Sequence, residues 1–185
     1  MSDNPARSPP AAFLTHTNET MADKVYNVLF LCTHNSARSV MAEAIMNHVG
    51  GRFKGYSAGS QPSGKVNPFA LEQIAKVGLP IEGIRSKDWD EFTLPGAPVM
   101  DFVFTVCDNA ASEVCPVWPG QPMTAHWGVP DPSLVQGPDE QKRRAFSQTF
   151  ALLRSRIHLF AALPIERIDR LAITTKLVEI GKSNS

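Results

Sequence analysis

Apolar residues form two kinds of pattern along this chain. Short runs rich in branched and aromatic residues predict four buried strands, at residues 25–31, 53–58, 100–106 and 122–127. Apolar residues at helical spacing predict helices over residues 36–49, over 67–77, and from 139 past 157 to a stop at Pro164. Strands that alternate with helices indicate an α/β fold with a parallel sheet and right-handed crossovers.

The two ends of the chain differ from this central part. Residues 1–23 contain prolines and polar residues without periodicity, which predicts a flexible N-terminal arm before a domain that spans residues 24–163. Residues 164–185 form a predicted C-terminal helical extension. Its apolar stripe consists of Ile165, Ile168, Leu171 and Ala172, before Gly181. A stripe shows only that something is buried, so the extension packs either on the same domain of a monomer or on the second subunit of a homodimer.

Composition narrows the functional classes. With 185 residues, 43% of them hydrophobic, the chain is long enough for one domain with a sizeable core. Eighteen basic residues balance eighteen acidic ones, which argues against nucleic acid and membrane-surface partners. No apolar run approaches the length of a membrane span or resembles a signal peptide, so we expect a cytoplasmic protein.

The three cysteines are expected to be reactive thiols. Disulfide frameworks are rare in the cytoplasm, and the spacing of Cys32, Cys107 and Cys115 fits no zinc-binding CxxC pattern.

Cys32 stands where the first predicted strand meets the first predicted helix. With Arg38 and Ser39 it forms a Cys-x5-Arg-Ser frame, and a loop this short must turn its backbone amides around one point. Such a nest at a helix start binds a tetrahedral oxyanion. The predicted oxyanion-binding residues are Thr33, His34, Asn35, Ser36, Ala37, Arg38 and Ser39.

These surroundings predict that Cys32 is a nucleophile. Helix-start amides and a guanidinium favour the thiolate, so we expect the pKa of Cys32 to be lowered, to roughly 3.5 to 7.5. Arg38 offers a planar fork for two oxyanion oxygens, and Ser39 can donate a hydrogen bond to the sulfur. The alternative is a buried structural cysteine with a surface arginine, but the strand–loop–helix context favours the catalytic interpretation.

A second loop, which follows the fourth predicted strand, offers an acid. It reads His-Trp-Gly-Val-Pro-Asp-Pro from His126, and the carboxyl of Asp131 can protonate a leaving oxygen. Asp-Pro is also a common turn pair. His34 and His126 have no sequence partner that identifies a role for either.

Taken together, these motifs resemble the low-molecular-weight protein tyrosine phosphatase superfamily, and within it the arsenate reductases. The resemblance covers residues 26–163. It rests on Cys-Thr-x-Asn-Ser-x-Arg-Ser from Cys32, Ser-Ala-Gly from Ser57, Cys107 after Phe-Thr-Val, and the loop from His126. It implies a three-layer sandwich around a four-stranded sheet of order 2-1-3-4, and it identifies Asp131 with the superfamily's catalytic acid.

The resemblance also implies a reaction. Cys32 would attack arsenate, water would leave with help from Asp131, and a second thiol would release arsenite by attacking Cys32; phosphate or sulfate would compete for the site. In the family's sheet order the strands that end at Cys32 and Cys107 are neighbours, about 4.8 Å apart, which is within reach of a disulfide. Cys107 is therefore the predicted resolving thiol.

The electron donor is left open. In thioredoxin-coupled relatives a third cysteine completes a relay, and Cys115 would do so here if residues 108–114, a predicted helix, rearrange. Seven residues separate Cys107 from Cys115, one more than in that type, so glutathione with glutaredoxin, or another small thiol, is the alternative. Either cysteine is also compatible with a small buried residue.

Some relatives hold a potassium ion near the loop. The matching positions are Asn35, Glu43, Ser57 and Asp88. Two loop positions depart from the family pattern: His34 stands where glycine is frequent, so its backbone must suit a residue with a Cβ, and Ala37 replaces a cysteine of many relatives.

Two other functions compete with arsenate reduction. A tyrosine phosphatase would use Cys32, Arg38 and Asp131 through a phosphocysteine. In those enzymes tyrosines typically follow the Asp-Pro pair, whereas Ser133 and Leu134 follow it here. A non-catalytic oxyanion sensor is the third interpretation, and the presence of nucleophile, arginine and acid together argues against it.

Overall fold

A four-stranded parallel sheet forms the centre of the molecule in the computed structural model, which describes residues 24–113 and 116–184. The predicted arm, residues 1–23, lies outside the described residues. The strands are β1 (Tyr26–Cys32), β2 (Phe53–Gly59), β3 (Phe102–Thr105) and β4 (Met123–His126). They lie in the order β2-β1-β3-β4 with every neighbouring pair parallel, which confirms the predicted sheet.

The predicted helices are present, with changes at their ends and faces. The longer ones are α1 (Arg38–Val49), α2 (Pro68–Lys76), α4 (Asp139–Ala161) and α5 (Arg170–Lys182). Asn67 caps α2, because its side chain accepts a hydrogen bond from the Phe69 amide. The first helix begins two residues later than predicted. His48 is exposed, whereas Met46 is buried because α1 packs against both β2 and α4.

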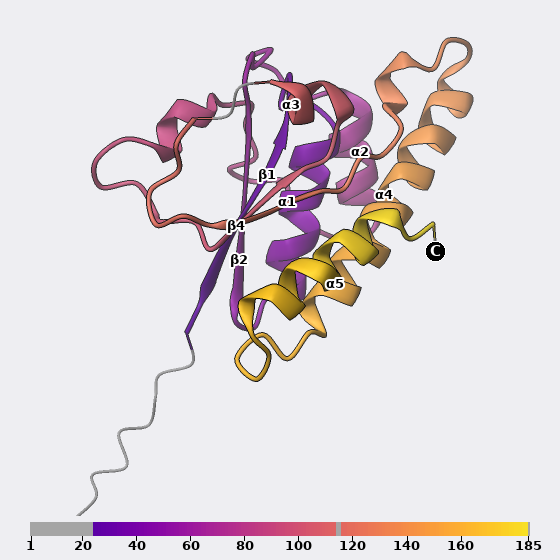
Figure 1. Ribbon diagram of the computed structural model, residues 1–185. Helices are drawn as coiled ribbons and strands as arrows, with labels where there is room; N and C mark the ends of the chain where they lie inside the picture. The colour runs from indigo at the N-terminus through magenta and orange to yellow at the C-terminus, as the bar shows by residue number, and fades with distance from the viewer. Residues whose placement is uncertain (1–23, 114–115, 185) are drawn as a thin grey trace, which may run out of the picture.

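The two faces of the sheet are covered differently. Val28 and Phe30 of β1 point into the larger core cluster, which α1, α4 and α5 complete. Leu29 and Leu31 point the other way, toward a smaller cluster with Trp118 and Phe92 of the short 3-10 helix η1 (Trp89–Phe92). Figure 1 shows the long helices on one side of the sheet and the η1 segment on the other. This is the predicted three-layer arrangement, with one thin layer.

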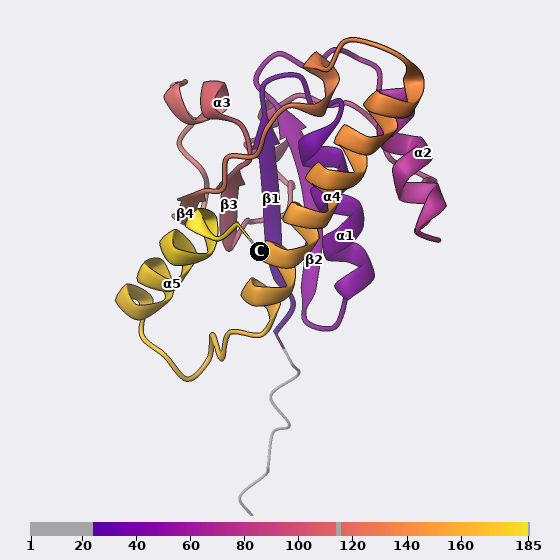
Figure 2. The same cartoon turned by 90° about the vertical axis from the view of Figure 1, so that its right-hand side faces the viewer.

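The C-terminal segment packs on the same chain. Helix α5 lies beside β4 and the end of α4 (Figure 2), and the Trp127 indole donates a 2.9 Å hydrogen bond to the Leu177 carbonyl. The predicted stripe holds at Ile165, which is buried, but it is wrong within α5. There Leu171 is 77% exposed, and the buried residues are Ile173, Leu177 and Ile180. In the part of the chain that the structure describes, no helix is both long and apolar enough to cross a membrane.

Candidate active site

The loop from Thr33 to Ala37 connects β1 to α1 at the carboxyl edge of the sheet. Its carbonyls are bound by the surrounding protein: those of Thr33, His34 and Ser36 accept hydrogen bonds from the amides of residues 61, 63 and 67 at 2.8–3.0 Å. Every peptide bond described is trans, so in each peptide unit the N–H of the following residue points away from the direction of the C=O group. The loop therefore turns N–H groups toward its concave side, as an oxyanion nest requires.

Asn35 holds the loop in this shape. It has a left-handed backbone conformation, with φ 46°, and it is fully buried. Its side chain donates to the Ser39 and Ser57 hydroxyls at 2.9 and 3.0 Å and accepts from the Lys87 amide at 2.8 Å. Both amide protons and the carbonyl are thus used, which offsets the cost of the strained backbone. His34, by contrast, has an ordinary backbone and an exposed side chain, so no glycine is needed there.

The end of β2 presses closely against this loop. A Cβ on Gly59 would lie 2.5 Å from the Thr33 carbonyl oxygen and 3.0 Å from the Asn35 amide nitrogen. Only glycine allows that approach without a shift of the loop.

Ser39 points its hydroxyl at the Cys32 sulfur. The Cys32 Sγ to Ser39 Oγ distance is 2.8 Å, and the Ser39 oxygen already accepts a hydrogen bond from the Asn35 side chain. The Ser39 proton is therefore directed at the sulfur, which favours a thiolate.

Burial opposes that effect and outweighs it. Cys32 is 3% exposed, and the loss of water raises the pKa of its thiol, although the Ser39 hydroxyl, the Ser39 amide and Arg38 all lower it. The predicted fall in the pKa of Cys32 was thus wrong. The local motif reveals the amides and the guanidinium, but it does not reveal how completely the fold covers the sulfur.

Arg38 and Asp131 meet across the site. The Arg38 guanidinium contacts the Asp131 carboxylate at 2.6 Å and donates to the Val129 carbonyl at 3.2 Å. Asp131 also caps the 3-10 helix η2 (Pro132–Leu134), accepting from the Ser133 amide at 3.0 Å. The predicted acid and the predicted oxyanion-binding arginine are therefore direct neighbours.

The loop that carries Asp131 rests on the helical layer. Arg156 of α4, itself buried, donates to the carbonyls of Trp127 and Gly128 at 2.9 and 3.1 Å. Burial lowers the pKa of Arg156. This support was not anticipated, because Arg156 lies on a helix distant in sequence from the loop that it holds.

Cys107 lies beside the loop, as expected. The Val106 amide binds the Leu31 carbonyl at 2.8 Å, which places the residues after β3 next to the end of β1. The Cys107 sulfur lies 3.7 Å from the Thr33 hydroxyl and accepts from the Ala110 amide at 3.4 Å, at the start of α3 (Asp108–Ser112). Residues 114–115 lie outside the described residues, so Cys115 is not placed.

A cavity of about 410 Å³ brings these groups together. Arg38, Cys107 and Asp131 all contribute to its lining. The second thiol, the arginine and the acid thus face one space large enough for a small oxyanion.

The predicted potassium positions are only partly assembled. Asn35 and Glu43 both contact Ser57, whose hydroxyl donates to the Glu43 carboxylate. The Asp88 carboxylate instead caps η1 by accepting from the Asp90 amide. The Lys87 ammonium lies within 3.3 Å of both Glu43 and Ser57, so the residues present do not fit a potassium ion at this position.

Comparisons with known proteins agree with this geometry. A family model described as low molecular weight phosphotyrosine protein phosphatase matches residues 27–171. Arsenate reductases of Halalkalibacterium halodurans and Bacillus subtilis are 38% and 37% identical over 135 residues, which cover 72% of this chain and 94% of each relative.

Solved structures give the same picture. An arsenate reductase "in the phosphate binding state" has a TM-score of 0.59 at 27% identity, over 72% of this chain and 95% of that one. A low molecular weight protein tyrosine phosphatase from T. tengcongensis shares the fold, with a TM-score of 0.55 at 23% identity over the same shares.

Proposed function

The chain belongs to the low molecular weight phosphotyrosine protein phosphatase family, and from this premise we propose that it reduces arsenate to arsenite. The observation that carries the proposal is a second thiol beside the loop that follows Cys32. Cys107 lines the same cavity as Arg38 and Asp131, at the end of the strand next to Cys32. A phosphatase has no use for that thiol, whereas arsenate reduction needs an electron pair from it. The arsenate reductase relatives support the same assignment.

The first step is binding and attack. The loop amides and the Arg38 fork hold the oxyanion with its central atom toward Cys32. The Cys32 sulfur attacks arsenic, one As–O bond breaks, and the oxygen leaves as water. In balance, the Cys32 thiol, one hydrogen arsenate dianion and the proton of the Asp131 carboxyl give a singly charged thiol–arsenate adduct on Cys32, one water molecule and the Asp131 carboxylate.

The raised pKa of Cys32 does not prevent this attack. An oxygen of a bound arsenate dianion can accept the thiol proton within the complex, so the thiolate forms where the anion is held. The Ser39 hydroxyl and Arg38 stabilise it there, because both favour the charged sulfur. Asp131 supplies the proton that the departing oxygen needs.

The second step transfers two electrons. The Cys107 sulfur attacks the Cys32 sulfur, a disulfide forms, and the S–As bond breaks with its electron pair going to arsenic. Arsenic(V) becomes arsenic(III), and the product leaves as the dihydrogen arsenite anion, having gained the Cys107 proton. An external thiol, from thioredoxin or from glutathione with glutaredoxin, then reduces the disulfide.

Phosphate-ester hydrolysis is the second candidate, favoured by the family description itself. Cys32, Arg38 and Asp131 serve that reaction equally well. The side chains after the Asp-Pro pair argue against a grip on an aromatic substrate, because Ser133 and Leu134 are both exposed and neither is aromatic.

A paired assay tests the proposal. Arsenite formation is followed with arsenate and, in separate reactions, thioredoxin with its reductase or glutathione with glutaredoxin; hydrolysis of p-nitrophenyl phosphate is measured on the same preparation. We expect arsenite with at least one donor and a much smaller kcat/KM for the ester. Efficient ester hydrolysis without arsenite from either donor would reject the proposal in favour of a phosphatase.

A further inference from the structure

We infer that the Lys87 ammonium takes the place of a bound monovalent cation beside the oxyanion loop, and that Lys87 is a positioning residue for that loop. The inference rests on the proposed function only for its turnover measurement. It explains the poor fit of the residues at positions 35, 43, 57 and 88 to a potassium ion.

The contacts of the ammonium are those of a coordinated cation. Lys87 Nζ lies 3.2 Å from Glu43 Oε2, 3.3 Å from the Ser57 hydroxyl and 3.1 Å from the Arg85 carbonyl. An ammonium has three protons, and three oxygens surround it. Lys87 is 8% exposed, so the fold has taken this charge almost entirely out of water. A lysine in that position normally needs a charged partner, which Glu43 provides.

Hydrogen bonds connect this ammonium to the nucleophile. The Ser57 oxygen accepts from Lys87 Nζ and from the Asn35 side chain. Asn35 also donates to Ser39, and Ser39 contacts the Cys32 sulfur. The chain of contacts thus runs from the ammonium to the thiol through three uncharged side chains.

Lys87 also holds Asn35 from its other end. Its backbone amide donates to Asn35 Oδ1 at 2.8 Å, while its ammonium holds the Ser57 hydroxyl that Asn35 Nδ2 binds. One residue therefore fixes both ends of the amide that keeps the loop in its left-handed turn. Loss of the ammonium leaves the Glu43 charge without its partner and removes one of these two supports.

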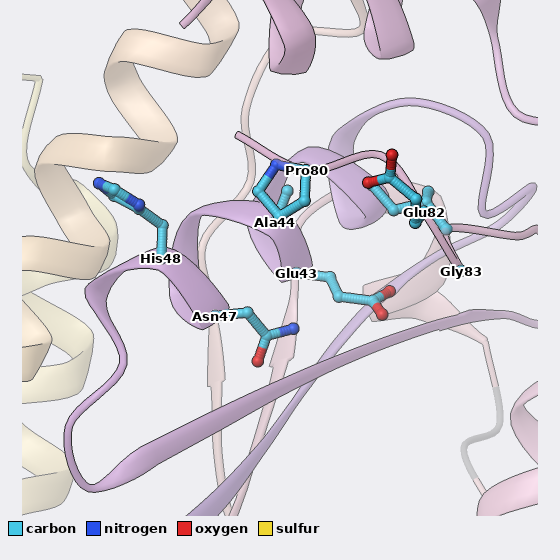
Figure 3. A pocket seen from close by; sticks show the side chains of 8 residues that line it. Glu43, Ala44, Asn47, His48, Pro80, Glu82 and Gly83 are labelled. Carbon is cyan, nitrogen blue, oxygen red and sulfur yellow. The ribbon is translucent and has the colours of Figure 1, made fainter. Parts of the chain in front are cut away.

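The Glu43 carboxylate can be reached from outside. Glu43 lines a pocket of about 340 Å³ between α1 and the loop that includes Pro80 and Gly83, and Figure 3 shows its carboxylate directed toward that loop. A small cation from solution can enter this pocket when the lysine side chain is cut back. Potassium and methylammonium are small enough to do so, whereas choline is bulkier and buries its charge under methyl groups.

The test compares wild type, Lys87→Ala and Lys87→Met in chloride salts of potassium, methylammonium or choline at equal ionic strength. Three quantities are measured: the dissociation constant of inorganic phosphate, the thermal midpoint, and KM and kcat for arsenate. We expect wild type to change less than about twofold among the salts. In choline, Lys87→Ala should bind phosphate roughly tenfold more weakly, because the partly buried Glu43 carboxylate loses its charged partner and disturbs the loop. Potassium or methylammonium should restore binding and raise the thermal midpoint.

Matched variants separate a charge effect from a packing effect. Lys87→Met fills most of the lysine's volume without its charge, so it should stay impaired in every salt. Lys65→Met removes a charge from an exposed loop and should behave as wild type. If the single variants fold poorly, Lys87→Met with Glu43→Gln removes both charges together and should fold and ignore potassium.

Three outcomes would overturn the inference: activation of wild type by potassium, unchanged phosphate binding in Lys87→Met, or a folded Lys87→Ala that no cation restores. Failure of the proposed function looks different, because wild type would then form no arsenite while the effects on phosphate binding and thermal midpoint persist.

Discussion

The two described thiols lie at the ends of neighbouring strands, yet the structure around them differs. Both are buried, and both precede a helix. Cys32 is followed by a loop in which Asn35 makes three side-chain hydrogen bonds. Its sulfur lies 2.8 Å from the Ser39 hydroxyl. Cys107 caps a helix of five residues, and its sulfur has two longer contacts of 3.4 and 3.7 Å.

This contrast fits different roles for Cys32 and Cys107. In the proposed reaction, the first thiol holds an anion in a fixed geometry, and its loop is bound to β2, α1 and the Lys87 segment. The second thiol has to move to reach the proposed adduct on Cys32. The short helix after Cys107 buries Ala110, and its first residue, Asp108, has a 90% exposed side chain that contacts His126 at 2.9 Å. Such exposed contacts are weak, which suits a segment that moves.

The largest effect is expected where the nucleophile is removed. Cys32→Ser should lower arsenite formation by at least about 10³-fold, because a hydroxyl cannot form the redox-active sulfur adduct. The measurement is arsenite release with an excess of the external thiol. Cys107→Ser is the matched control, since it should still allow the first adduct to form at Cys32. Residual turnover by Cys32→Ser near the wild-type rate would remove Cys32 from its assigned role.

Removal of the acid should have the next largest effect. Asp131→Asn keeps the shape of the side chain but has no proton to give, so kcat should fall about 10²-fold. Phosphate binding should change far less, because Arg38 remains to hold the anion. Steady-state kinetics over a range of pH, with phosphate as inhibitor, measures both quantities; an unchanged rate at every pH would mean that the acid lies elsewhere.

A smaller effect is expected at the hydroxyl that contacts the sulfur. Burial raises the pKa of Cys32, so its alkylation by iodoacetamide should speed up as pH rises. Ser39→Ala removes a contact that lowers this pKa. The alkylation profile should therefore move to higher pH, with a rate a few-fold lower at pH 8.

Peptide mass spectrometry distinguishes Cys32 from Cys107 in that experiment. Ser63→Ala, an exposed serine of a neighbouring loop, is the control. A profile that moves to lower pH in Ser39→Ala would contradict the direction of the Ser39 contact.

The smallest effect should come from the attachment of α3. His126→Ala removes contacts to Asp108 and Thr105, both 2.9 Å, so hydrogen exchange in α3 should become a few-fold faster. Arsenate turnover should stay within about threefold of wild type, because exposed contacts contribute little to stability. Thr124→Ala, exposed on the same strand, is the control. Equal exchange rates in all three proteins would mean that His126 does not hold the helix.

The Cys32 side of the site could be predicted from the sequence because the residues that form it follow one another in the chain. Strand, loop and helix follow one another from Cys32 to Ser39, and the strand ends place Cys107 once the sheet order is known. The pairing of Arg38 with Asp131 joins two such motifs. In these regions the sequence pattern agrees with the fold, so the pattern was enough to predict the local structure.

The parts that were missed depend on contacts between distant residues. Lys87 is 44 residues from Glu43 and 30 from Ser57, and no spacing rule joins them. The pKa of Cys32 depends on how fully the fold buries it, which no motif records. The face of α5 was misjudged because a short stripe of apolar residues fits more than one helical phase, and packing against Trp127 selects the phase.

In the proposed reaction, Cys107 resolves an arsenate adduct on Cys32. The most direct measurement treats reduced Cys115→Ser protein with arsenate, and separately with phosphate, without external thiol, and then maps disulfides by peptide mass while counting arsenite. This variant stops the relay at its first disulfide. We predict a Cys32–Cys107 disulfide with about one arsenite per chain, in arsenate alone. Free Cys32 and Cys107 after arsenate treatment, or the same disulfide in phosphate, would show that Cys107 does not resolve an arsenate adduct on Cys32.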